Sequence, residues 1–138
     1  MPDFARISVN IAQVSGVFDY SIPQEIRTTV SVGSLVEVPF GRQIVQGIVV
    51  ELMEEASVPE TKPVAAVIET EPVVTPAQIQ LAAELARVNF STLSSFLDLM
   101  VPPGLSQHAD VRLHLLPGQL PDKLTPVQAR ITALLKKR

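Results

Sequence analysis

The segment Phe18-Asp19-Tyr20 holds the side chains best suited to bind a nucleotide. Aromatic rings stack on bases without reading their identity, and an ionised carboxylate accepts a hydrogen bond from a hydroxyl. The same pattern fits an ordinary strand with two core aromatics and one surface acid. Strict alternation along a strand places Asp19 on the face opposite Phe18 and Tyr20. All three line one pocket only where the strand bends or ends.

Two further segments carry groups that a nucleic acid could contact. Residues 38–42, Val-Pro-Phe-Gly-Arg, are typical of a tight connection between strands. Gly41 would let a ligand approach the backbone closely, and Arg42 would offer positive charge. Lys62 is a lone cation at the end of an acidic loop, where it could contact a phosphate. A hairpin turn and a solvated lysine are the structural alternatives, and each signal alone is weak.

No catalytic or cofactor site can be assembled from the sequence. It has neither of the glycine-rich loops that cradle phosphates, and the absence of cysteine excludes disulfides and thiolate zinc sites. His108 and His114 are poor metal ligands, because Asp110 is the only acid between them. No Ser-His-Asp set is evident. We therefore predict no enzymatic activity, cofactor or metal for these residues alone.

Composition indicates a globular protein that does not coat DNA. The 138 residues are 46% hydrophobic and 18% charged, which suits one modest domain. The net charge of −3 argues against broad contact with a DNA backbone, but it permits a pocket that touches a few phosphates. We find no apolar run long enough to span a bilayer and no export signal. We therefore expect a cytoplasmic protein without membrane contact.

The first half of the chain has the pattern of a small, mainly β domain. Five short strands are expected, over residues 5–11, 17–22, 35–38, 43–52 and 64–68. The first alternates, with Ile7, Val9 and Ile11 facing the core and Arg6, Ser8 and Asn10 facing solvent. Gly47 inside the fourth predicts a bulge or a close backbone approach. Short strands at regular spacing predict a small barrel or sandwich.

Two helices are expected after the strands. Thr75 as N-cap, Pro76 at the first helical position and Gln78 of a capping box predict a helix that runs to about residue 88. Its buried stripe should comprise Ile79, Ala82, Ala83 and Ala86. A second helix is expected over residues 92–100.

The remaining residues form a linker and one more helix. Residues 106–123 are rich in proline and glycine and are predicted to be a linker, with a short strand over 111–115 as the exception. The helix-start signal recurs at Thr125, and the apolar stripe that follows it has no evident partner. We therefore expect domain boundaries at 1–105 and 124–138, the latter being the start of a truncated domain in a longer protein.

Taken in order, these segments resemble PriA helicases, the bacterial replication-restart helicases. The residues that carry the resemblance begin with Val17-Phe18-Asp19-Tyr20-x-Ile22-Pro23 and Gly33-Ser34-x-Val36-x-Val38-Pro39-Phe40-Gly41-Arg42, followed by Gly47-Ile48-Val49-Val50. They continue with Lys62-Pro63-Val64, Val67-Ile68-Glu69-x-Glu71-Pro72-Val73, Val101-Pro102-Pro103-Gly104-Leu105 and Leu124-Thr125-Pro126-x-Gln128. The similarity covers most of residues 6–105, and the ordered set is specific although no single piece is.

The resemblance implies a β-barrel-like DNA-binding domain that recognises the free 3′ end of the nascent leading strand at stalled forks. The binding residues carried over by position are Phe18, Asp19, Tyr20, Gly41, Arg42 and Lys62. Asp19 would accept a hydrogen bond from the 3′-hydroxyl, the aromatics and Gly41 would contact the terminal nucleotide, and Lys62 would lie near phosphate. The resemblance also implies a winged-helix domain from residue 124, primosome proteins as partners, and an ATP-dependent helicase motor elsewhere in the full-length protein.

One departure and two alternatives accompany this interpretation. The family's first helix commonly ends in an aromatic pair, whereas this chain has Val88-Asn89-Phe90, which would weaken packing of the helices on the barrel or mark a divergent member. A protein-interaction module that adds a partner strand to an exposed sheet edge would suit the acidic balance. A degenerate paralogue that keeps the fold without binding DNA ends is the other alternative.

Overall fold

The computed structural model describes residues 1–11, 14–69, 71–105, 115, 117–118 and 120–136. The chain divides into two compact units, residues 1–108 and 109–138, which are described separately. Among the described residues, no helix is both long and apolar enough to cross a membrane.

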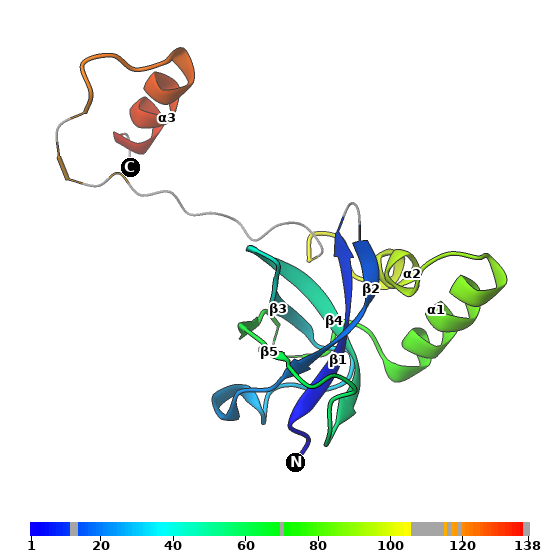
Figure 1. The fold of residues 1–138 in the computed structure, drawn as a ribbon. Coiled ribbons are helices and arrows are strands. Elements are labelled where there is room, and N and C mark those ends of the chain that lie inside the picture. The colour runs from blue at the N-terminus through cyan, green and yellow to red at the C-terminus, as the bar shows by residue number, and fades with distance from the viewer. Residues whose placement is uncertain (12–13, 70, 106–114, 116, 119, 137–138) are drawn as a thin grey trace. The chain divides into compact units, whose positions relative to one another are not determined.

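The first unit is built on one curled, mainly antiparallel sheet (Figure 1). Its strands are β1 (Phe4–Ile11), β2 (Val14–Ser21), β3 (Leu35–Phe40), β4 (Gln43–Met53), β5 (Lys62–Pro63) and β6 (Ala66–Val67), with a short 3-10 turn at Gln24–Ile26. The strand order is β5-β2-β1-β4-β3-β6, and among the described pairings the β2–β5 pairing alone is parallel. The prediction of a small barrel-like β domain followed by helices is confirmed.

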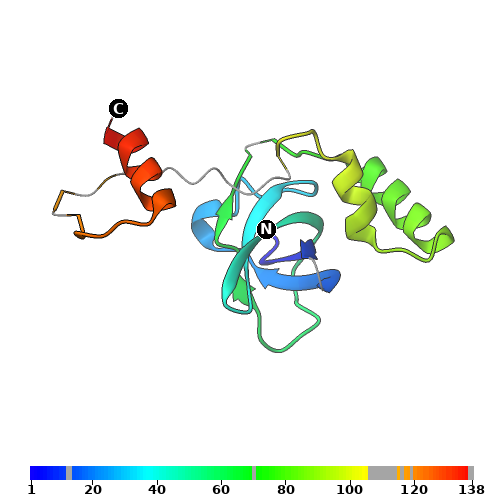
Figure 2. The ribbon, with the colours of Figure 1, turned by 90° about the horizontal axis from the view of Figure 1, so that it is seen from above.

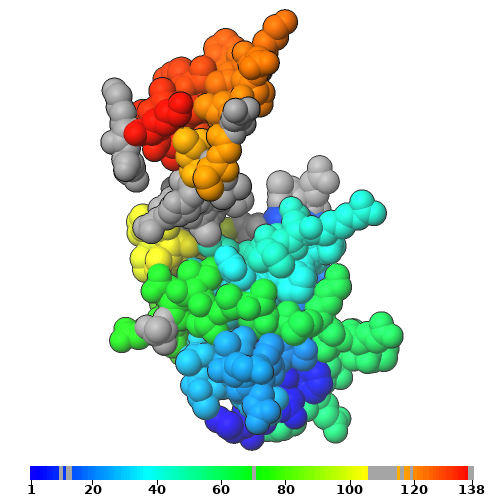
Figure 3. Space-filling view, turned by 90° about the vertical axis from the view of Figure 1, so that its left-hand side faces the viewer, coloured from blue at the N-terminus to red at the C-terminus, as the bar shows by residue number. Residues whose placement is uncertain are grey.

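The segment 62–67 bridges the two edges of the sheet. The Val64 amide donates to the Ser21 carbonyl at 2.9 Å, and the Ala65 amide donates to the Glu37 carbonyl at 2.8 Å. In the space-filling view this segment lies, in green, between the light-blue region that follows β2 and the cyan β3–β4 hairpin (Figure 3). The single strand expected over 64–68 is therefore wrong. The segment forms two short strands because it pairs first with β2 and then with β3.

Glycine shapes the β3–β4 hairpin and its contact with β1. A two-residue loop, Gly41-Arg42, joins the strands, and the φ of +61° at Gly41 suits the first central position of a II′ turn. At Gly47 an added Cβ would lie 2.4 Å from the Ile7 side chain, so the predicted close approach is present. The bulge itself lies elsewhere: the β1–β4 register shifts so that Val50 is the extra residue.

The barrel interior is filled by the inward side chains of β1 to β4. These are mainly small and β-branched residues, together with Tyr20 from β2 and Val64 from the bridging segment. One expectation about β1 is wrong, because Ser8 is only 5% exposed. The strand is buried on both faces here, since helix α2 packs over β1 and β2 from outside the barrel.

Two helices, α1 (Pro76–Val88) and α2 (Leu93–Met100), lie together outside the curled sheet, as the view from above shows (Figure 2). The capping box that begins α1 is formed: the Gln78 amide donates to Thr75 Oγ1 at 3.2 Å, and the Thr75 amide donates to Gln78 Oε1 at 2.8 Å. A second core joins helices and sheet through Leu35, Ile48, Val74, Ala82, Leu97 and Val101.

Two features of the helix pair differ from expectation. Ala83 is exposed, and Leu85 is partly buried in its place. Phe90, in the turn between the helices, is 99% exposed with φ 51°. Its ring therefore takes no part in packing the helices on the barrel.

The second unit contains helix α3 (Pro126–Lys136), which begins where the capping signal predicts. The Gln128 amide donates to Thr125 Oγ1 at 3.3 Å. No side chain of α3 is buried. His108, His114 and all but the last residue of the strand expected over 111–115 lie outside the described residues, as does much of the linker expected over 106–123.

Candidate nucleic-acid interface

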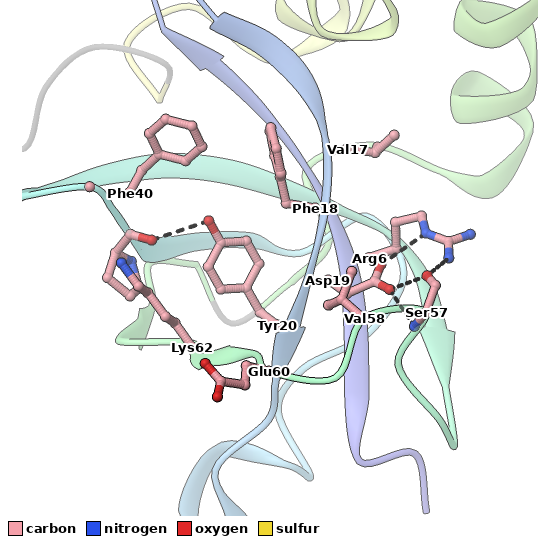
Figure 4. A pocket seen from close by; sticks show the side chains of 12 residues that line it. Arg6, Val17, Phe18, Asp19, Tyr20, Phe40, Ser57, Val58, Glu60 and Lys62 are labelled. Atoms are coloured by element: carbon pink, nitrogen blue, oxygen red, sulfur yellow. Dashed lines mark hydrogen bonds and ion pairs between the residues drawn. The ribbon is translucent and has the colours of Figure 1, made fainter.

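A cavity of about 370 Å³ opens at the edge of the sheet where β2 passes the β3–β4 turn and the segment 57–62 (Figure 4). Its size falls within the range of small-molecule sites. Five of the six residues that sequence analysis singled out line it: Phe18, Asp19, Tyr20, Gly41 and Lys62. The sixth, Arg42, is exposed at the tip of the hairpin and is not part of the lining.

The strand edge explains how residues on opposite faces of β2 reach one cavity. Phe18 and Tyr20 point to one side of the strand and Asp19 to the other, as alternation requires (Figure 4). Strand β5 pairs with β2 only at Tyr20 and Ser21, so in the described structure the earlier part of β2 is a free edge. A ligand that wraps around this edge can therefore contact both faces.

The apolar half of the cavity is an aromatic cluster. The rings of Phe18 and Phe40 meet edge to face, with centroids 5.2 Å apart and planes at 67°. Tyr20 is 4% exposed, and its hydroxyl donates to the Pro39 carbonyl at 3.2 Å. Burial raises the pKa of Tyr20, so the phenol remains a neutral donor. Tyr20 thus forms a fixed wall, whereas the partly exposed Phe18 and Phe40 present ring surface for stacking.

The polar half is centred on Asp19, whose side chain is 5% exposed. Arg6, directly opposite on β1, donates from Nε to Asp19 Oδ1 at 3.0 Å. The Ser57 amide donates to Asp19 Oδ2 at 2.8 Å, and the Ser57 hydroxyl donates to the same oxygen. Arg6 Nη2 in turn donates to Ser57 Oγ at 2.9 Å, which closes a ring of three side chains.

This ring keeps the Asp19 carboxylate ionised. Burial by itself raises the pKa of Asp19, but the hydrogen bonds from Ser57 and Arg6, with the charge of Arg6, outweigh it and hold the pKa below the ordinary 3.8. Arg6 also bonds Glu51 at 2.8 Å, which fixes the guanidinium from a second side. The cavity therefore contains an oriented anion that accepts hydrogen bonds at neutral pH.

Gly41 and Lys62 form the remaining rim. At Gly41 an added Cβ would meet no atom within 4 Å, so the bare backbone faces open space that a ligand can enter. Lys62 is exposed and pairs in register with Tyr20, and among the described residues it has no ion pair. With Arg6, Asp19 and Glu60 also in the lining, two cations face two anions and the cavity is neutral overall.

Sequence reasoning did not identify Arg6, Phe40 and Ser57 as site residues. The sequence does contain a signal for Arg6, because the first two alternating strands are consecutive and their antiparallel register pairs Arg6 with Asp19. Phe40 lies within the motif that ends at Gly41 but looked like part of a turn. Ser57 has no signal, since it is one polar residue in an acidic loop. Within the described ranges, no three His, Cys, Asp or Glu residues gather in a way that could hold a metal ion.

Comparisons with known proteins show the family to which the chain belongs. Residues 6–102 match the PriA family model described as 3′DNA-binding domain (3′BD). The Replication restart protein PriA of Synechocystis sp. (strain ATCC 27184 / PCC 6803 / Kazusa) is 33% identical over 122 residues, which cover 86% of this chain and 14% of that protein. The chain thus corresponds to a small part of this relative. It belongs to the PriA family of 3′ DNA-binding domains.

Proposed function

We propose that this domain binds the free 3′ end of a DNA strand, with the terminal nucleotide in the cavity beside β2. The observation that carries the proposal is the ionised, almost buried Asp19 carboxylate next to the aromatic pair of Phe18 and Phe40. A terminal 3′-hydroxyl is a hydrogen-bond donor, and the interior of a strand has no such group. A carboxylate acceptor therefore selects strand ends.

The other cavity groups suit a nucleotide of any sequence. The partly exposed rings of Phe18 and Phe40 offer a stacking surface worth roughly 1–3 kcal/mol per base. The open backbone at Gly41 admits the sugar or base closely, and Lys62 is placed to meet a phosphate. Arg42 lies outside the lining, so we assign it at most a contact with more distant phosphate.

The charge of the cavity favours selection over raw affinity. Because its two cations face two anions, the cavity should contact few phosphates and release few counterions on binding. Each contacted phosphate of a single strand adds about −0.7 to the slope of log affinity against log salt concentration, so the salt dependence should be shallow. A carboxylate near phosphates repels them and lowers affinity. Its presence is explained if its role is to distinguish a free 3′ end from other parts of the DNA.

In the full-length protein we propose that the domain targets a replication-restart helicase to the 3′ end of a nascent strand at a stalled fork. Primosome proteins would be its partners there, in the cytoplasm. The motor activity would reside outside these residues, for which we propose no catalytic role. This placement rests on family membership and on the relative named above.

The proposal is tested by fluorescence anisotropy with short single-stranded oligonucleotides that end in a 3′-hydroxyl or a 3′-phosphate. We expect the wild type to prefer the hydroxyl and Asp19→Ala to lose that preference. Glu51→Gln is the matched control, since Glu51 also bonds Arg6 but does not line the cavity. Equal binding of both ends by the wild type, or an unchanged preference in Asp19→Ala, would overturn the proposal.

A further inference from the structure

We infer that the Ser57 hydroxyl holds the place of the terminal 3′-hydroxyl in the free domain, and that the DNA end must displace it to reach Asp19. This inference rests on the proposed function and makes Ser57 a specificity-determining residue of the same site. It is carried by the ring of Arg6, Asp19 and Ser57, in which the serine hydroxyl donates to Asp19 and accepts from Arg6.

The ring leaves Asp19 few acceptor positions that a ligand could use. A carboxylate offers about four lone-pair positions, and three of them already accept hydrogen bonds from Arg6 Nε, the Ser57 amide and the Ser57 hydroxyl. The side chain is also 5% exposed, so the remaining position is poorly accessible. A DNA end therefore gains a full bond to Asp19 by replacing a donor rather than by adding one.

Ser57 is the donor that a terminal hydroxyl can replace most directly, because both are aliphatic hydroxyls. In the ring, Ser57 Oγ donates to Asp19 Oδ2 and accepts from Arg6 Nη2 at 2.9 Å. A 3′-hydroxyl at the same position makes the same two bonds, one as donor and one as acceptor. The exchange leaves both Asp19 and Arg6 satisfied, and it makes Arg6 the second protein contact of the terminal hydroxyl.

The segment that carries Ser57, residues 54–61, has few contacts that would oppose its displacement. Within the described structure, the hydrogen bonds that tie residues 54–61 to the domain between the ends of β4 and β5 are those of Ser57. Residues 57–60 are exposed, and Val58 and Glu60 line both the cavity and a second hollow of about 590 Å³ on the segment. The segment is thus a thin wall with open space beside it.

Donor exchange would sharpen selection against blocked ends. A 3′-phosphate that is fully ionised has no proton to donate to Asp19 and brings negative charge beside it. The 3′-phosphate therefore cannot replace the hydrogen bond that Asp19 loses when the Ser57 hydroxyl is displaced. A 3′-hydroxyl replaces that bond with an equivalent one, so the ring admits only an end with the right chemistry.

The test compares wild type, Ser57→Ala and Thr61→Ala with 3′-hydroxyl and 3′-phosphate oligonucleotides in the anisotropy assay. Thr61 is the matched control, because it lies in the same segment but outside the cavity lining. Removing the competing hydroxyl should raise affinity for the 3′-hydroxyl end by roughly tenfold, the factor that corresponds to about 1.4 kcal/mol. Affinity for the 3′-phosphate end should not rise, and Thr61→Ala should match the wild type.

A second measurement needs no DNA. The pKa of Asp19, followed by NMR, should rise in Ser57→Ala, since a hydrogen bond to the ionised form is lost. An unchanged pKa would mean that the ring does not exist in solution, which overturns the inference. So would a Ser57→Ala variant that binds the 3′-hydroxyl end no better than wild type, or worse, while wild type still prefers that end. If wild type shows no end preference, the proposed function itself has failed.

Discussion

Asp19→Asn should destabilise the domain at neutral pH, independently of any effect on DNA binding. Asp19 accepts three hydrogen bonds, from Arg6 on one oxygen and from two groups of Ser57 on the other. An asparagine amide has one acceptor oxygen and one donor nitrogen, so it satisfies either Arg6 or Ser57 and opposes the other. Hydrogen bonds to charged groups contribute about 1.5–3 kcal/mol each, but Arg6 is one-third exposed and keeps Glu51, which favours the lower end. We expect a loss of about 2 kcal/mol.

The loss should depend on pH in one direction. The folded-state pKa of Asp19 is lowered below 3.8, so the unfolded chain binds this proton more tightly than the folded domain. The stabilisation by Asp19 is therefore fully present above pH 3.8 and is lost as the pH falls through the folded pKa. The asparagine variant has no such titration. The difference in unfolding free energy between wild type and Asp19→Asn should therefore narrow as the pH falls below 3.8.

Thermal unfolding followed by circular dichroism at several pH values measures both effects. A loss of 2 kcal/mol corresponds to a melting temperature lower by roughly 8–16 °C in a domain of this size. Glu51→Gln is the control, because Glu51 is 54% exposed and should change stability by no more than about 1 kcal/mol at any pH. A difference in unfolding free energy between wild type and Asp19→Asn that stays constant from about pH 7 to about pH 2.5 would refute the reasoning, because it would show that the carboxylate charge is irrelevant.

Three further predictions test other parts of the structure, and the first two compare matched pairs of variants. Gly33→Ala should lower the free energy of unfolding by more than about 2 kcal/mol, because φ is +92° and the new Cβ would lie 1.9 Å from the Val74 carbonyl oxygen. Gly41→Ala should cost about 1 kcal/mol of backbone strain, since its Cβ meets no atom, but it should impair DNA binding. Leu97→Ala should cost about 2–5 kcal/mol in chemical denaturation, and Leu99→Ala, which is 80% exposed, less than about 0.5 kcal/mol. Lys62→Gln should reduce the salt slope of oligonucleotide binding by about 0.7, and an unchanged slope would exclude its phosphate contact.

The elements that the sequence predicts well are those with local causes. The helix that begins at Pro76 depends on Thr75 and Gln78, which lie within three residues of each other and bond as expected. The turn at Gly41 likewise depends on one residue that tolerates a positive φ. Such signals act over a few residues, so a single sequence contains them in full.

The errors in the fold come from contacts that are distant along the chain. Ser8 was expected to face solvent, but α2, more than eighty residues later, covers that face of β1. The expected strand over 64–68 is split because its two ends pair with different strands, β2 and β3. Periodicity records how one strand alternates and contains no information about which partner lies beside it.

The site divides in the same way. Alternation correctly places Asp19 opposite Phe18 and Tyr20, but whether they share a cavity depends on where β5 stops pairing with β2. Arg6 becomes a site residue only through the β1–β2 register. Ser57 enters through the path of a loop, which no motif encodes.

The ring around Asp19 also accounts for a conflict within the proposed function. A bare carboxylate would repel every phosphate of an approaching strand, including the strand whose end it is meant to bind. Arg6 lies 3.0 Å from Asp19 and compensates its negative charge, and the Asp19 side chain is almost buried. The interior of a DNA strand that contacts this surface is therefore not repelled by the carboxylate. Only a group that donates to Asp19 and accepts from Arg6 can replace Ser57 in the ring. Selectivity would then arise from the bond that is exchanged, while attraction is left to the stacking surface and Lys62.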